Sequence, residues 1–379
     1  MILAPYSNLL KPAVIAFDWK PTHRLIHGKN APKKPAPMKS AMPVSEPPTK
    51  RTIIAIGPHE LDLFFRGPSS GPERLTSLLP GATFFIPDRA NEGWGDFLRS
   101  ARPNILVTAW STPLVPADLP DLQYVCHVCG SVKKTVPREL IERGVIVTNW
   151  GDSVSEGLAE AALLLALSAL RRSHYFSDQM HIKRGWQMYP AGTKTLFESR
   201  VGIHGFGASA RRLVALLRPF RVQVSAFSQN VPDEMFQSLG VRRSASLDEL
   251  FSTSDVLFEM EALIPETTGV VTERLLRLLP QDATFVNVAR GALVDEDAAT
   301  RLAAEGKIRL ALDVYAEEPL PADSPLRDLK EVVLFPHVAS PTDDRLHRCG
   351  DYALENLARF MRGEPLAARV SLDVFDRST

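Results

Sequence analysis

The residues with the clearest chemical meaning are two glycines in the segment VGIHGFGASARRL. Gly205 and Gly207 follow an apolar run typical of a strand and precede a run typical of a helix, and Ala210 completes a G-x-G-x-x-A pattern. In such a pattern the first glycine permits a tight turn, and the second lets the backbone approach a pyrophosphate at the helix N-terminus. The segment therefore predicts a dinucleotide site that includes Ala208 and Ser209.

The acidic residue that usually holds the adenosine ribose is missing from this pattern. It is expected about 20 positions after the glycines, where the chain reads AFSQN at residues 226–230. Ser228 occupies that place, and Asp233 and Glu234 follow a little late. No arginine stands in the same stretch to bind a 2′-phosphate. The choice between NAD(H) and NADP(H) is therefore open, with NAD(H) favoured.

Three later segments carry polar residues directly after apolar runs. They are NVARGALVDED around Arg290, LDVYAEEPLP around Asp313 and Glu318, and LFPHVAS around His337. Each residue alone has an ordinary explanation, because an arginine after a strand is usually a surface charge and a lone histidine is usually structural. Open α/β sheets, however, bind their ligands at the C-terminal ends of strands. Their joint occurrence after the glycine turn predicts a functional site.

Two series of apolar, β-rich runs must position these residues. The first lies within 52–149 (TIIAI, ATFFI, NILVTAW, LQYVCHV, VIVTN) and the second within 200–336 (RVGIHG, VQVSAF, DVLFEM, ATFVNVA, IRLALDV, EVVLFP). Continuous apolarity predicts strands covered on both faces, as in parallel sheets. The long apolar helix EGLAEAALLLALSALRR separates the series, with Asp152 or Ser153 as its N-cap, and an amphipathic helix ends at Gly363. The fold class is therefore α/β, with two doubly wound parallel-sheet domains.

Composition excludes several classes of protein. Lys plus Arg and Asp plus Glu both total 44 in 379 residues, so no charge excess favours nucleic acid or a membrane surface. Three cysteines are too few for a disulfide framework, and no apolar run reaches the roughly 18 residues of a membrane span. We expect a cytoplasmic protein. Residues 1–51 are predicted to form an N-terminal extension and a Pro/Lys-rich linker.

Taken together, these motifs resemble the D-isomer-specific 2-hydroxyacid dehydrogenases over residues 52–370 or so. The resemblance implies hydride transfer between a nicotinamide cofactor and a small 2-oxo/2-hydroxy acid. It also implies a Rossmann cofactor domain (153–339) inserted into a flavodoxin-like substrate domain (52–152 plus 340–379), and a homodimer formed through the cofactor domain.

The same resemblance implies roles for single residues. Arg290 would bind the substrate carboxylate and polarise the carbonyl. His337 would be the acid/base, with Glu318 orienting its imidazole and favouring the charged form. Asp313 would hold the nicotinamide carboxamide, and Ala289 would line the cofactor site.

A substrate loop is expected in VCHVCGSVKKTV. The resemblance implies that backbone N–H groups in this loop bind the substrate carboxylate, those of Cys129, Gly130, Ser131 and Val132. Lys133 and Lys134 replace the acidic and amide residues that the family usually has here. A substrate that carries more negative charge than a simple 2-oxo acid is therefore also compatible with the loop. Residues 110–112 (Trp-Ser-Thr) are further candidates for lining the cleft.

Other signals are assigned to structure. Residues 126–129 (CHVC) offer two thiols and one imidazole but no fourth ligand nearby, so we predict buried cysteines and no metal site. His204 is expected to pack beside the cofactor without a catalytic role. Met260 and Ala262 replace a histidine and a proline that the family usually has near the cofactor.

One alternative function belongs to a different class of protein. A nicotinamide-sensing binding protein of the corepressor type would bind the cofactor with little or no turnover. The altered loop at Lys133 and Lys134 and the N-terminal arm favour it. The identity of the 2-oxo acid is also left open, with glyoxylate, hydroxypyruvate and longer acids all compatible.

Overall fold

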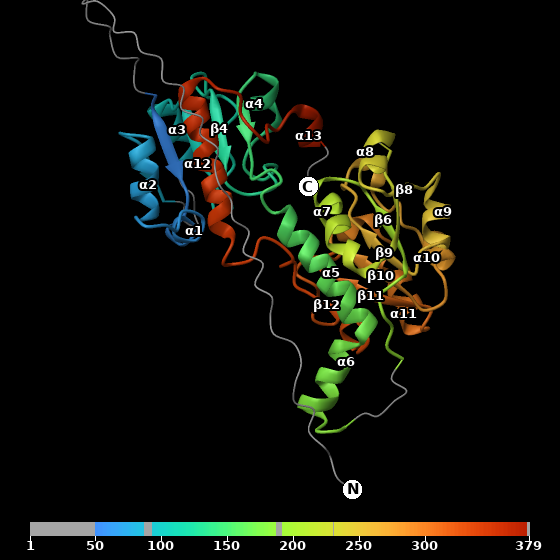
Figure 1. Ribbon diagram of the computed structural model, residues 1–379. Helices are drawn as coiled ribbons and strands as arrows, with labels where there is room; N and C mark the ends of the chain where they lie inside the picture. The colour runs from blue at the N-terminus through green and yellow to red at the C-terminus, as the bar shows by residue number, and fades with distance from the viewer. Residues whose placement is uncertain (1–49, 87–92, 187–191, 230, 377–379) are drawn as a thin grey trace, which may run out of the picture. The chain divides into compact units, whose positions relative to one another are not determined.

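The computed structural model describes residues 50–86, 93–186, 192–229 and 231–376 (Figure 1). Almost all of the predicted extension and linker lies outside these residues. Among the described residues, no helix is both long enough and apolar enough to cross a membrane.

The first sheet contains five parallel strands in the order β2-β1-β3-β4-β5. Their bounds are Thr52–Ala55 (β1), Thr83–Phe85 (β2), Ile105–Thr108 (β3), Tyr124–His127 (β4) and Ile146–Thr148 (β5). This order is that of flavodoxin-like sheets and confirms the predicted architecture. All five predicted runs contain a strand, although each strand is shorter than its run.

Helices cover both faces of the first sheet. One face packs against α1, α2 and α12, and the other against α3, α4 and α13. Their bounds are Pro58–Phe64 (α1), Gly71–Leu78 (α2), Trp94–Ala101 (α3), Arg138–Glu142 (α4), Leu346–Arg362 (α12) and Leu372–Asp376 (α13). Coverage on both faces explains the continuous apolar runs, because residues on both sides of β1, β3 and β4 are buried, whereas the edge strand β2 is partly exposed.

Helix α12 reaches the first sheet from the far end of the sequence, as the family resemblance implied (Figure 1). A Cβ at Gly350 would lie 1.8 Å from the Phe64 carbonyl oxygen, so the two helix backbones are in close contact. The Cys126 thiol of β4 also donates to the Ala353 carbonyl at 3.7 Å. These contacts assign α12 to the first sheet, whereas the domain boundaries at 152/153 and 339/340 remain a proposal.

The second sheet contains seven parallel strands in the order β12-β11-β10-β9-β6-β7-β8. Their bounds are Arg200–His204 (β6), Gln223–Phe227 (β7), Arg242–Arg243 (β8), Val256–Glu259 (β9), Ala283–Asn287 (β10), Ile308–Leu312 (β11) and Val333–Leu334 (β12). Counted from β6, this is the Rossmann order, and it reverses direction between β6 and β9. Strand β8 was not predicted, because its two arginines are exposed at the sheet edge and form no apolar run.

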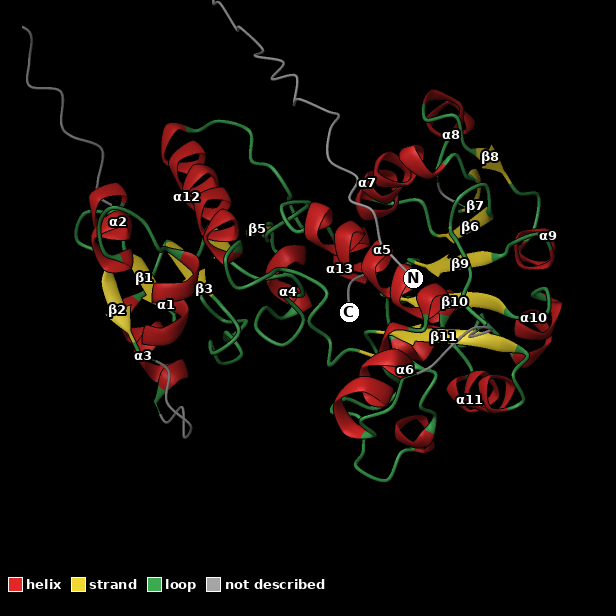
Figure 2. Ribbon diagram, turned by 60° about the horizontal axis from the view of Figure 1, so that its bottom comes forward, coloured by secondary structure: helices red, strands yellow, loops and turns green. Residues whose placement is uncertain are grey.

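Two groups of helices enclose the second sheet. Figure 2 shows α5 and α7 on one side and α9, α10 and α11 on the other. The bounds are Ser155–Arg171 (α5), Ser173–Ser177 (α6), Ala208–Leu217 (α7), Asp233–Ser238 (α8), Leu247–Ser252 (α9), Glu273–Leu278 (α10) and Glu296–Ala304 (α11). Along β6, Val201 and Ile203 face α5 and α7, whereas Gly202 faces Ser254 and Leu250 near α9.

The predicted N-cap of α5 was wrong. The helix begins at Ser155, and the preceding Val154 makes no side-chain capping hydrogen bond. The backbone carbonyl of Asp152 instead accepts from the Ser155 N–H at 3.0 Å. A backbone carbonyl therefore accepts the hydrogen bond at the start of the helix, where the side chain of Asp152 or Ser153 was expected to accept one.

Candidate active site

The glycine turn joins β6 to α7 at the point where the strand order reverses. Gly205 has φ +86°, and a Cβ there would lie 2.6 Å from backbone atoms of Met260 and Glu261, so only glycine fits. A Cβ at Gly207 would have no described atom within 4 Å. The first turn of α7 also lacks a side-chain cap, which leaves the N–H groups of Ala208 and Ser209 available. The turn therefore has a shape that suits a pyrophosphate, and cofactor binding by these residues remains a prediction.

The adenosine end of this site differs from the simple expectation. Ser228, directly after β7, is buried, and its carbonyl accepts from Nη2 of Arg243 at 3.0 Å. The Arg243 guanidinium also pairs with the Asp233 carboxylate. Arg243 therefore lies beside Ser228, where the local sequence contains no arginine. The local sequence around Ser228 gave no signal, because Arg243 lies 15 residues later on the unpredicted strand β8.

His337 and Glu318 form a direct pair beyond the ends of β12 and β11. Nδ1 of His337 lies 2.7 Å from Oε2 of Glu318. The other oxygen, Oε1, accepts from the backbone N–H of Tyr315 at 3.0 Å. The carboxylate is therefore held from two sides, and the imidazole is 44% exposed.

Asp313 fixes the loop that carries His337. Its carboxylate accepts the N–H of Val338 at 2.8 Å and that of Ala339 at 3.1 Å, and its carbonyl accepts the His337 N–H at 2.8 Å. Burial raises the pKa of the Asp313 carboxyl above its ordinary value, against the opposing effect of these N–H groups. The structure thus gives Asp313 a positioning role, and its predicted contact with nicotinamide remains a prediction.

Arg290 follows β10 and is brought close to the Glu318 loop by a glycine. A Cβ at Gly291 would lie 1.8 Å from the carbonyl carbon of Tyr315, so the two loops touch through their backbones. Nη1 of Arg290 donates to the Ala289 carbonyl at 2.6 Å. Burial lowers the pKa of Arg290, while the charges of Glu318 and Asp313 act in the opposite direction. Cation, carboxylate and imidazole thus gather at adjacent strand ends.

The predicted substrate loop has backbone donors to offer. Among the described residues, none accepts a hydrogen bond from the N–H groups of residues 129–132. A Cβ at Gly130 would lie 2.6 Å from the Trp150 ring, so glycine allows the loop to pack against the indole. Lys133 and Lys134 are exposed. Carboxylate binding by this loop stays a prediction that its geometry permits.

The residues after β3 divide into two groups. Trp110 is 55% exposed, but Thr112 is buried and its hydroxyl accepts from the Ala109 N–H at 2.8 Å. The prediction that Thr112 lines the cleft is therefore wrong. Ser111 is held by hydrogen bonds to Glu60.

The cysteines are structural, as predicted. Cys126, Cys129 and Cys349 are buried and free. Burial raises the pKa of Cys126 to about 11 and lowers that of His127 to about 4, so neither group is charged near neutral pH. Within the described part of the chain, no cluster of histidine, cysteine and acidic residues is suited to a metal ion.

Comparison with known proteins follows the same lines. The family model described as D-isomer specific 2-hydroxyacid dehydrogenase, NAD binding domain, matches residues 163–339. Glyoxylate reductase of Aeropyrum pernix is 33% identical over 228 residues, which cover 58% of this chain and 68% of the relative. The chain belongs to the D-isomer specific 2-hydroxyacid dehydrogenases.

Further relatives of this dehydrogenase carry related names. The human glyoxylate reductase/hydroxypyruvate reductase is 30% identical over 62% of this chain and 72% of its own length. D-3-phosphoglycerate dehydrogenase of Methanocaldococcus jannaschii is 32% identical over 59% of this chain, but the match spans only 42% of that protein. The glyoxylate reductase structure from Paecilomyes thermophila has the same fold, with a TM-score of 0.72 at 23% identity over 85% of this chain and 98% of that one.

Family membership makes the chain a nicotinamide-dependent oxidoreductase acting on 2-oxo or 2-hydroxy acids. Solved structures with the same fold include one with NADPH and one with NAD. Nothing in these comparisons supports the corepressor-type alternative.

One feature of this dehydrogenase escaped the sequence analysis. His204, the last residue of β6, is buried, and its Nδ1 lies 2.6 Å from Oε2 of Glu259, the fully buried last residue of β9. Oε1 of Glu259 accepts the Glu261 N–H at 3.0 Å. Burial opposes the charged imidazole, but the carboxylates of Glu259 and Glu261 raise the pKa of His204 above its ordinary value. The pair thus joins the strand before Gly205 to the loop that crosses it.

Loss of this pair is expected to destabilise the protein. Replacing Glu259 by alanine leaves a buried imidazole without its partner, and the free energy of unfolding should fall by about 3–5 kcal/mol. Glu259→Gln preserves the shape, its amide oxygen can accept the Glu261 N–H, and its NH2 group can donate to a neutral His204 Nδ1, so its loss should be less than half as large. Urea denaturation of both variants and the wild type measures the difference. A loss below about 1 kcal/mol for Glu259→Ala would show that the pair adds little.

Proposed function

We propose that the protein reduces small 2-oxo acids to D-2-hydroxy acids with hydride from a reduced nicotinamide cofactor. The observation that carries the proposal is the His337–Glu318 pair at 2.7 Å, beside Arg290 at the ends of adjacent strands. A histidine held by a carboxylate suits proton transfer near neutral pH. The reductase names of relatives that this chain largely covers support the reductive direction.

The bound cofactor would supply the hydride. The residues of this chain would bind the anionic substrate and supply the proton. The Arg290 guanidinium would bind the substrate carboxylate and polarise the carbonyl. His337 would donate a proton from Nε2 to the carbonyl oxygen, because Nδ1 faces Glu318. The Glu318 carboxylate would stabilise the imidazole while it is protonated.

The cellular location and the oligomeric state are also part of this proposal. We propose that the protein acts in the cytoplasm, since its three cysteines are free and such thiols persist under reducing conditions. We also propose a homodimer formed through the cofactor domain, as the family resemblance implies. Size-exclusion chromatography with light scattering would test the dimer.

Turnover tests the catalytic proposal directly. The full-length protein is mixed with NADH or NADPH and with glyoxylate, hydroxypyruvate, pyruvate or 2-oxoglutarate, while the absorbance of reduced nicotinamide is followed. We expect loss of absorbance with at least one acid, and in the reverse direction oxidation of the D but not the L hydroxy acid. Nucleotide binding without turnover across the panel would overturn the proposal and favour a binding protein.

A further inference from the structure

The pocket at the end of β7 and β8 holds one cation in a fixed position. Three of the five N–H groups of Arg243 are used: Nη1 donates to the Val231 carbonyl at 3.2 Å and to Asp233, and Nη2 donates to the Ser228 carbonyl at 3.0 Å. Among the described residues, none accepts from Nε–H or from the second Nη2–H. The guanidinium therefore keeps donors for a ligand.

Stacked rings relate this arginine to the glycine turn. Phe206, between the two glycines of the turn, stacks on Phe236 of α8 with ring centroids 4.4 Å apart and planes at 9°. The Arg243 guanidinium lies over the Phe236 ring, 5.1 Å from its centroid. The cation is thus held beside the part of the site suited to the pyrophosphate, at the end where the adenosine ribose is expected.

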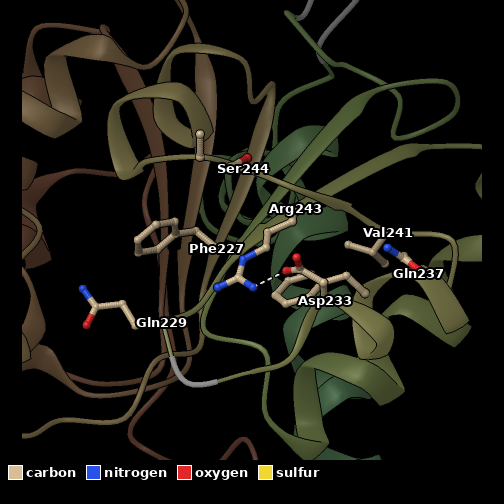
Figure 3. Close-up of a pocket in the computed structure, with 9 residues that line it drawn as sticks. Phe227, Gln229, Asp233, Gln237, Val241, Arg243 and Ser244 are labelled. Carbon is tan, nitrogen blue, oxygen red and sulfur yellow. Dashed lines mark hydrogen bonds and ion pairs between the residues drawn. The ribbon is translucent and has the colours of Figure 1, made fainter.

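The space around Arg243 is large enough for part of a nucleotide. Figure 3 shows Arg243 with Phe227, Gln229, Asp233 and Ser244 around it. These residues line a cavity of about 490 Å³. The arginine side chain is 37% exposed, so a ligand can reach it. Apart from Asp233 and Arg243, the residues that line the cavity are uncharged.

Three of the acids near this end are already bound to other groups. Asp233 pairs with Arg243, and the Glu259 carboxylate is fully buried between His204 and the Glu261 N–H. The Glu261 side chain accepts from the Ala262 N–H at 2.9 Å. Discrimination against a 2′-phosphate normally rests on a carboxylate that binds the ribose hydroxyl. Here Ser228 holds that place, and its carbonyl is bound to a cation.

We propose that Arg243 binds the 2′-phosphate of the adenosine ribose, so that the protein prefers NADP(H) to NAD(H). The inference rests on the proposed function and names its cofactor. A guanidinium suits phosphate because its planar N–H groups match two phosphate oxygens. Asp233 orients the guanidinium but also repels the phosphate, so its removal should strengthen binding.

Two nucleotides that differ only in the 2′-phosphate isolate this contact. Calorimetric titration of the full-length protein with 2′,5′-ADP and with 5′-AMP should give at least about tenfold tighter binding of 2′,5′-ADP. Arg243→Gln should remove that preference while leaving the 5′-AMP affinity within about twofold. Asp233→Asn should raise the affinity for 2′,5′-ADP and leave that for 5′-AMP unchanged. NADPH and NADH fluorescence titrations should rank in the same order.

Arg242→Gln is the matched control. Arg242 lies on the same strand but bonds to Ser225 and Glu249 instead of lining the cavity, so its loss removes one charge without touching the site. This variant should keep the preference for 2′,5′-ADP. If Arg242→Gln lost the preference as fully as Arg243→Gln does, the effect would be general charge and the proposal would fail.

Other outcomes would also overturn the inference. If Arg243→Gln weakened both nucleotides equally, Arg243 would serve only to hold the loop after β7. Equal wild-type affinities, or weaker 5′-AMP binding in Asp233→Asn, would point to NAD(H) held by Asp233. In these cases turnover of 2-oxo acids would persist, so the catalytic proposal would stand. Failure to bind either nucleotide would overturn both.

Discussion

His337→Gln is expected to lower kcat for 2-oxo acid reduction by about 10²- to 10⁴-fold, the usual contribution of a general acid. The imidazole is the more exposed member of the His337–Glu318 pair, and its removal leaves no side chain held by Glu318 to protonate the product oxygen. Steady-state kinetics with the best acid from the panel measures the loss. Binding of 5′-AMP should be unchanged, which separates lost chemistry from a misfolded cofactor site.

Glu318→Gln is the companion to that variant. The amide can still accept the Tyr315 N–H, but it no longer stabilises a protonated imidazole. We expect kcat to fall by about tenfold, because the proton donor loses the carboxylate that orients and stabilises it. If His337→Gln kept more than a tenth of wild-type activity, His337 would not be the acid.

Gly291→Ala is expected to reduce kcat/KM by about 100-fold, because displacements near 1 Å cost that much in a positioned site. The added Cβ would lie 1.8 Å from the carbonyl carbon and 2.0 Å from the carbonyl oxygen of Tyr315, and backbone atoms cannot turn aside as a flexible side chain can. The loops that carry Arg290 and Glu318 must therefore separate. Overpacking should also lower the free energy of unfolding by about 1–3 kcal/mol.

Gly95→Ala provides the control for Gly291→Ala. Gly95 lies in α3, and the atom nearest to its added Cβ is the guanidinium nitrogen of Arg99, 3.1 Å away at the end of a flexible chain. Activity should be unchanged and stability should shift by less than about 1 kcal/mol. Wild-type activity in Gly291→Ala would show that the contact between the two loops does not position the site.

The sequence predicted those parts of the fold that short-range patterns encode. The apolar runs of both sheets, the glycine turn and the three motifs around Arg290, Glu318 and His337 are each contiguous, and all fall at the ends or along the length of real strands. Both strand orders agreed with the expected architecture. The motif residues were predictable because parallel strands bring their C-terminal ends to one edge.

The parts that were missed depend on contacts between distant residues. Nothing in the sequence distinguished Arg243 from an ordinary exposed arginine, because its position beside Ser228 results from the pairing of β8 with β7. The His204–Glu259 pair joins residues 55 positions apart, and neither has a motif to mark it. The N-cap of α5 failed because a backbone carbonyl replaced the side chain. Strand pairing and backbone turns of this kind leave no local signature for a single sequence to reveal.

The docking of α12 on the first sheet has a consequence for how the chain folds during synthesis. Cys126 and Ala353 are 227 residues apart, and every strand of the second sheet lies between them. The ribosome therefore releases the whole second sheet before the helix that completes the first core. Until then the apolar surface of α1 and β4 stays uncovered, and exposed surface of this kind is where partly folded chains aggregate.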